Sequence, residues 1–280
     1  MTSPATTPFY LLMTGLLAGI SIVLALLPAR ITAAGFTRTM ALIGTACGLA
    51  AVLYDVWFRL GPAARPALGS RLGGLAAGSL VLASVCLILL ARRSSLEPPP
   101  GAGLARLASL FSVPVVLILP CLLLQDARWD LEILAALGGL AGAALLGSGL
   151  SAMLLGHSYL VVPGLSIAPL RRLCRGFVAA SLARCALDGL VLAATGTAWF
   201  WPQTGASHDP LADLLGGMVP FLMHVLFGLV GPLILGMMAA RTVALHSTQS
   251  ATGILYGAVV FVLIGESAAL HLLVAAGIPL

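Results

Sequence analysis

Charge is what this sequence has least of. Only 8% of its 280 residues are charged, and Lys is completely absent. A soluble domain carries about 25% charged residues, so this chain has too little polar surface to keep a globule of its size in water. The hydrophobic fraction of 60% and the mean hydropathy of +1.10 agree with that conclusion. These values exclude a soluble protein.

Two kinds of motif are also absent. The five Cys residues form no Cys-x-x-Cys pair, and no His-Glu-x-x-His segment occurs. We therefore expect the Cys residues to act as small apolar packing residues, and we assign neither a metal site nor a catalytic residue. The net charge of +5 comes from 14 arginines, most of them in short connections between apolar runs. Membrane topology explains that pattern better than a nucleic-acid partner does.

What the chain has instead is a series of long apolar runs. A helix of about 18 or more apolar residues can cross ~30 Å of hydrocarbon. These runs are continuous in Leu and Ala, whereas a transmembrane β-barrel requires short alternating segments. The sequence thus predicts an all-α, polytopic integral membrane helix bundle of about eight transmembrane helices. The expected spans are 9–28, 39–58, 74–91, 107–125, 133–161, 177–199, 217–240 and 252–273.

The distribution of arginine predicts the orientation of these spans. Nine arginines lie in the first, third, fifth and seventh connections, and four lie in the second, fourth and sixth. Because positive charge is retained on the cytoplasmic side, the odd-numbered connections should be cytoplasmic and both termini outside. We accordingly expect a multi-pass protein of the bacterial plasma membrane, with the lipid bilayer and other membrane or peripheral subunits as its partners.

The chain is expected to form one membrane domain over 1–280. Within it, 1–93 holds the first three helices and 94–106 is a Pro-rich cytoplasmic connection. The remaining five helices, in 107–280, carry nearly all the ionisable groups that lie inside spans. Such groups are expensive in lipid and are candidates for function. We therefore place the candidate site in spans five to eight.

Three ionisable side chains in these spans are expected to form a proton or substrate path. Arg184 and Asp188 are four residues apart, which places them on one helical face where they can neutralise each other. Glu266 lies in the eighth span, and Arg184 is the one basic residue well inside any span. The alternative interpretation is a buried ion pair that only fixes helix packing.

Histidines in the same spans are candidate cofactor ligands. His224 is followed by Gly228 and Gly231 on its helical face, an arrangement that could leave room for a porphyrin ring. His271 is predicted to lie near the same membrane face as His224, and His157 near the opposite face. Two histidine sites at two depths could hold b-type haem or a quinone. Gly138, Gly142, Gly149 and Gly156 lie along one line of the fifth span, which suits close helix packing or a flat ring.

These features support three hypotheses about function. The first is a membrane subunit of an electron-transfer complex that binds quinone, with b-type haem as a further candidate cofactor. The second is a secondary transporter with a buried Arg–Asp path, and the third is a structural or assembly subunit. A stand-alone enzyme is less favoured, because Ser148, the candidate nucleophile, should lie deeper in the bilayer than His224 or His271.

Overall fold

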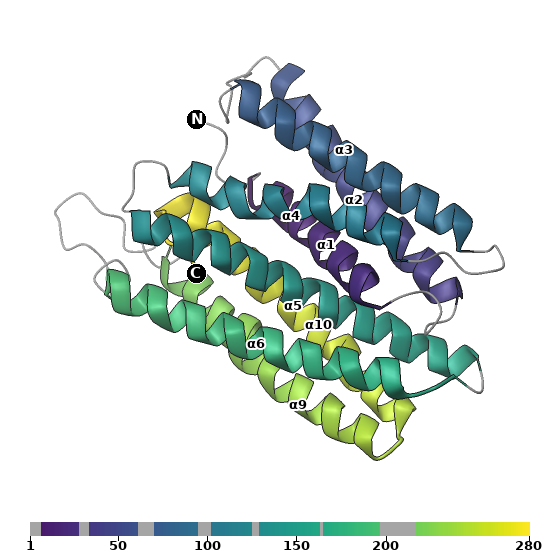
Figure 1. The fold of residues 1–280 in the computed structure, drawn as a ribbon. Coiled ribbons are helices and arrows are strands. Elements are labelled where there is room, and N and C mark those ends of the chain that lie inside the picture. Colours follow the sequence, from purple (N-terminus) through teal and green to yellow (C-terminus); the bar gives the residue numbers. More distant parts are fainter. Residues whose placement is uncertain are drawn as a thin grey trace.

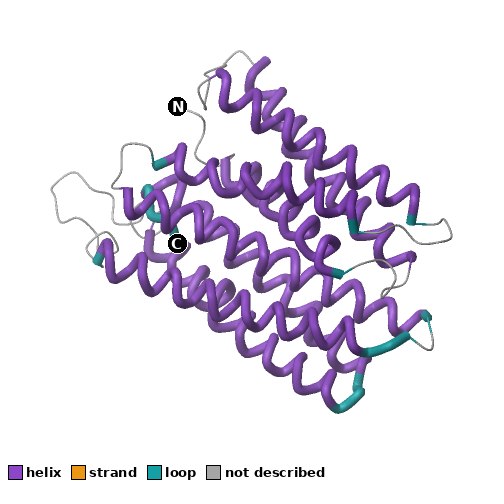
Figure 2. Tube along the Cα trace, in the orientation of Figure 1, coloured by secondary structure: helices purple, strands orange, loops and turns teal. Residues whose placement is uncertain are grey.

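The computed structural model describes residues 7–27, 34–60, 70–94, 102–124, 129–162, 165–196 and 217–280. Helices and short connections make up these residues (Figure 2). Eight of the helical segments are long and apolar enough to span a membrane, which confirms the predicted all-α bundle of about eight transmembrane helices. The orientation of the termini remains a prediction from the arginine distribution.

Figure 1 shows the order of the elements along the bundle. Their bounds are α1 Thr7–Leu26, α2 Ala34–Leu60, α3 Ser70–Arg93, α4 Gly103–Leu123, α5 Trp129–Val161, α6 Ala168–Thr195, α8 Val219–Met223, η3 His224–Val230, α9 Gly231–Ala244 and α10 Thr248–Ala276. The segments α8, η3 and α9 together form the seventh span.

Helix α5 lies at the centre of the bundle. It packs against α1, α4, α6 and α10, whereas α2 and α3 lie at one edge and α6 and α9 at the opposite edge (Figure 1). Its 33 residues correspond to a length of about 50 Å at 1.5 Å per residue, which exceeds the ~30 Å hydrocarbon layer. The predicted span 133–161 is likewise longer than one bilayer crossing, and the helix extends it by four residues at its start.

The first three helices and the last five share one core. A single cluster of buried side chains includes Leu17 of α1, Leu87 of α3, Leu145 of α5 and Leu255 of α10. The backbones of α1 and α5 lie very close together at Gly19 and Gly147, where a Cβ atom on Gly19 would lie 2.9 Å from the Gly147 Cα. Small residues at such crossings allow close van der Waals packing, which drives helix association in membranes.

Large apolar side chains cover much of the outside of the bundle. Leu53 and Leu75 are each 68% exposed, although they lie within the apolar spans of α2 and α3. A soluble protein rarely leaves so many large apolar groups in water. Lipid contact accounts for them, and the bundle is therefore a multi-pass membrane protein.

Seven of the eight predicted spans begin two to nine residues earlier in the structure, and the difference is largest for α6. Helix α6 starts at Ala168 instead of residue 177, so Arg171, Arg172 and Arg175 lie in its first turns and not in a connecting loop. Pro169 near the helix start explains the boundary, because its fixed φ suits the first helical turn. Helix α4 starts at Gly103, inside the predicted connection 94–106. The three prolines of that connection, residues 98–100, lie outside the described residues.

The seventh span is interrupted by a wider helical turn. Its middle part, η3, has π-helical geometry, and the Gly231 N–H donates to the Leu226 carbonyl five residues back. Pro232 follows directly and has no N–H to donate, so a regular α-helical hydrogen bond is missing there. Short π-helical segments are frequent at functional sites. His224 is the first residue of this segment.

Candidate functional site

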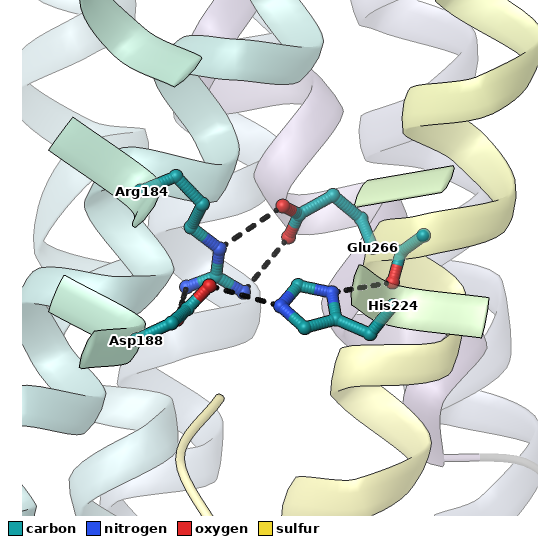
Figure 3. Close-up of polar contacts among 5 residues, drawn as sticks. Arg184, Asp188, His224 and Glu266 are labelled. Atoms are coloured by element: carbon teal, nitrogen blue, oxygen red, sulfur yellow. Dashed lines mark hydrogen bonds and ion pairs between the residues drawn. The ribbon is translucent and has the colours of Figure 1, made fainter. Parts of the chain in front are cut away.

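Four buried side chains form a polar tetrad between α6, η3 and α10 (Figure 3). Arg184 contacts Glu266 through two contacts, with Nε 3.1 Å from Oε1 and Nη2 3.3 Å from Oε2. Its remaining nitrogen, Nη1, lies 3.7 Å from Asp188 Oδ1. Asp188 Oδ2 lies 2.9 Å from His224 Nε2, and His224 Nδ1 lies 3.0 Å from the carbonyl oxygen of Gly265. We call Arg184, Asp188, His224 and Glu266 the tetrad.

The tetrad is closed off from its surroundings. Each of its four residues is at most 3% exposed, and His224 is completely buried. Ionised groups in such a place are costly unless they are paired and hydrogen-bonded. The two-point contact between Arg184 and Glu266 meets that requirement, because the planar guanidinium matches the two carboxylate oxygens. Arg184 and Glu266 together therefore carry no net charge.

His224 determines how many protons the tetrad holds. The Gly265 carbonyl can only accept a hydrogen bond, so His224 Nδ1 must carry a hydrogen. The second ring nitrogen, Nε2, faces a carboxylate. Either an imidazolium donates to ionised Asp188, or protonated Asp188 donates to a neutral ring. In both forms the His224–Asp188 pair holds one shared proton and has no net charge.

Removing that proton would change the hydrogen bonding and the net charge of the tetrad. A lone pair of His224 Nε2 would then face a carboxylate oxygen at 2.9 Å, and the tetrad would carry one uncompensated negative charge. Asp188 Oδ1 has no hydrogen-bond partner among the described residues, although Arg184 lies within ion-pair distance. It is therefore a buried acceptor position that no hydrogen-bond donor of the described residues satisfies.

Glycines of α5 make room for the two longest side chains of the tetrad. A Cβ atom on Gly138 would lie 2.9 Å from Arg184 Nη1, and one on Gly142 would lie 2.5 Å from Glu266 Oε2. The line of glycines predicted on the fifth span therefore accommodates the side chains of α6 and α10. A cavity of about 40 Å³ adjoins Arg184 and Glu266, which is enough for one or a few water molecules.

Two further glycines, Gly228 and Gly231, allow the seventh span to lie close to α10. A Cβ atom on Gly228 would lie 2.6 Å from His224 Nδ1 and 3.2 Å from the Gly265 Cα. The space next to Gly231 is filled by the ring of Phe261. Helix α10 thus occupies the room that the sequence suggested for a porphyrin beside His224, and neither ring nitrogen of His224 is free to bind iron.

The Gly228 contact leads to a prediction about stability. We expect Gly228→Ala to destabilise the fold by about 1–3 kcal/mol, the usual cost of overpacking, because η3 and α10 must separate. Unfolding of the purified protein by sodium dodecyl sulfate would measure the change. Gly253→Ala in α10 is the matched control, since a Cβ atom there meets none of the described residues within 4 Å. Equal stability of the two variants would contradict the close contact.

The structure separates the other predicted histidines from the tetrad. His271 lies in α10 next to a groove on the surface of the bundle. His157 is exposed near the far end of α5, with its Nδ1 3.4 Å from the Tyr256 hydroxyl. The structure therefore brings together Arg184, Asp188, His224 and Glu266, and leaves His157 and His271 outside. The described residues contain no group of three or more His, Cys, Asp or Glu placed to hold a metal ion.

Sequence reasoning missed the backbone partners of the tetrad. The Gly265 carbonyl fixes the protonation of His224, and the π-helical turn places the ring. One signal was present, since Gly265 directly precedes Glu266, and a glycine beside a buried acid allows close helix contact. The π-helical turn had a weaker signal in Pro232, which removes a donor from the helix.

Comparisons with protein-family models, curated proteins and solved structures gave no significant match. The class of protein is accordingly defined by the fold and the tetrad alone. It is a polytopic helical membrane protein with a buried, hydrogen-bonded ionisable cluster in its second half.

Proposed function

We propose that the protein is a proton-coupled membrane transporter in which the His224–Asp188 pair binds and releases one proton per cycle. The observation that carries the proposal is that both ring nitrogens of His224 face acceptors. One proton is needed to satisfy this arrangement, and its loss leaves one negative charge in a buried place. A change of that size favours a different packing of the helices, which is what coupling requires.

The interrupted seventh span supports this proposal. The segment η3 carries His224 and lacks a regular α-helical hydrogen-bond pattern, so it can rearrange at lower cost than an intact helix. Broken helices of this kind form the ion and substrate sites of many transporters. In the proton-loaded form, His224 ties η3 to α6 through Asp188 and to α10 through Gly265. Release of the proton would weaken the tie to α6.

Electron transfer with bound quinone is the second candidate function. The observation that favours it is a groove beside His271, between α8 and α10. A haem ligated by His224 has less support, because the ring is fully engaged and α10 fills the adjacent space. A membrane subunit of this kind would need partner proteins for its redox centres.

Transport can be tested with the proton as the probe. Everted membrane vesicles containing the protein would be energised, and the pH gradient followed with a fluorescent weak base while solutes from a panel are added. We expect at least one solute to dissipate the gradient with the wild-type protein. Asp188→Asn should reduce that response at least about tenfold, because the amide cannot exchange the shared proton.

Glu132→Gln is the matched control for Asp188→Asn. It also replaces a carboxylate by an amide, but at the first turn of α5 and outside the tetrad. Both variants should insert and purify like the wild type. Normal solute-driven dissipation by Asp188→Asn would overturn the proposal, and so would a wild-type protein that responds to no solute while showing a b-type haem spectrum.

A further inference from the structure

A groove of about 600 Å³ runs between α8 and α10 on the surface of the bundle. Val219, Pro220 and Met223 form one wall, and the other wall is a face of α10 that includes Ser267 and His271. The volume lies in the range of small-molecule sites. Because both walls belong to membrane spans, a ligand would reach the groove from the bilayer.

The lining of the groove specifies an uncharged ligand. None of the described residues that line it is Asp, Glu, Arg or Lys, so an ionic headgroup would find no opposite charge among them. The walls are aliphatic, with one thioether at Met223. Methionine sulfur makes favourable contacts with aromatic rings. The groove therefore suits a flat, uncharged ring better than a charged lipid headgroup.

Two polar side chains in the groove, Ser267 and His271, can hydrogen-bond to an oxygen atom on the ring. Ser267 and His271 are four residues apart and share one face of α10. The Ser267 hydroxyl donates to the Leu263 carbonyl at 2.6 Å, so its oxygen remains free to accept. Among the described residues His271 has no hydrogen-bond partner, and a neutral imidazole offers one donor and one acceptor. A ring hydroxyl could donate to either residue, and a ring carbonyl could accept from His271.

We propose that this groove binds a lipid-soluble, uncharged ring compound that carries a hydroxyl or carbonyl oxygen, with His271 and Ser267 as its hydrogen-bonding partners. Phenols and quinones belong to this chemical class. The proposal goes beyond the proton site and does not depend on it, because the tetrad faces the interior of the bundle. The two sites are nevertheless close in the chain, since Met223 precedes His224 and Ser267 follows Glu266.

Binding can be measured on the full chain in lipid nanodiscs with three probes of equal tail length. These probes are an alkylphenol, the corresponding alkylbenzene and a benzoquinone with the same tail. Each would carry a photoreactive group, and mass spectrometry would locate the crosslinks. We expect the two oxygen-bearing probes to label 219–223 and 263–271, and the alkylbenzene to label these segments at least about threefold less. One net hydrogen bond is worth about 1 kcal/mol, which corresponds to a three- to tenfold difference in affinity.

Three variants separate the groove from unspecific partitioning. His271→Leu should weaken labelling by the oxygen-bearing probes about three- to tenfold while leaving the alkylbenzene unchanged. Ala268→Phe should abolish labelling, because Ala268 lines the groove. Ala275→Phe is the matched control, since Ala275 is an exposed residue of the same helix outside the groove. Thermal unfolding would verify that all three variants are folded.

Several results would overturn the inference. Equal labelling by all three probes would show that they only partition into lipid, and labelling outside the groove would place the ligand elsewhere. Labelling by the alkylphenol and the benzoquinone alike supports the general class, and labelling by the benzoquinone alone narrows it to quinones. Asp188→Asn should label like the wild type. Normal solute-driven dissipation by Asp188→Asn together with intact labelling would refute the proton proposal and leave this one standing.

Discussion

Arg184→Gln should destabilise the protein by about 3–5 kcal/mol, the usual cost of breaking a buried ion pair. The guanidinium lies between two buried carboxylates, at 3.1 Å from Glu266 and 3.7 Å from Asp188. Without it, Glu266 loses its positive partner and Asp188 loses the nearby guanidinium, in a place that is at most 3% exposed. Arg175→Gln, at an exposed position of the same helix, should change the stability by less than about 0.5 kcal/mol.

A double-mutant cycle tests whether Glu266 is the main partner. Glu266→Gln alone should also be destabilising, because it leaves Arg184 with one distant carboxylate. In Arg184→Gln/Glu266→Gln the two amides can hydrogen-bond to each other and carry no charge. We therefore expect the double variant to lose less than the sum of the single losses, with a coupling of about 0.5–3 kcal/mol. Unfolding by sodium dodecyl sulfate provides all four values, and additivity within about 0.3 kcal/mol would contradict the pairing.

The sequence predicted those parts of the site that depend on one helix. Arg184 and Asp188 share a face because they are four residues apart, and that geometry holds in any α-helix. The eight spans could be predicted in the same way, since the length of an apolar run is a local property. The ends of the spans were predicted less accurately. Helix α6 continues through Arg171 and Arg172, whose charges mark the edge of the membrane but do not end a helix.

The contacts between helices could not be predicted in the same way. Nothing local to Glu266 says that its carboxylate reaches Arg184, which is 82 residues earlier in the chain. The same holds for His224 and Asp188, whose contact depends on how η3 packs against α6. Grouping His224 with His271 by depth therefore led to a haem or quinone site, whereas His224 lies inside the bundle and His271 at its surface groove. Two residues at the same depth in the membrane can lie on different sides of the bundle, so depth alone does not define a site.

His224→Leu and Asp188→Asn each change one partner of the same hydrogen bond, and we expect unequal effects on stability. Leu leaves Asp188 ionised and buried with only Arg184 at 3.7 Å, and Glu266 as a second carboxylate on that guanidinium. The variant should therefore lose about 3–5 kcal/mol. Asn has the charge of protonated Asp, and its amide can donate to His224 Nε2. Asp188→Asn should accordingly remain within about 1 kcal/mol of the wild type, because the net charge of the tetrad stays zero.

The comparison of these two variants separates a proton site from a purely structural ion pair. Asp188→Asn imitates the proton-loaded tetrad, so it should unfold like the wild type in sodium dodecyl sulfate yet fail to move protons. If the carboxylate of Asp188 instead serves only to anchor the packing of α6, Asp188→Asn should be destabilised as strongly as His224→Leu. That outcome would favour a structural subunit, because an amide that restores the hydrogen bond without the negative charge would have failed to restore the fold. If Asp188→Asn is as stable as the wild type but does not move protons, the function depends on the exchangeable proton.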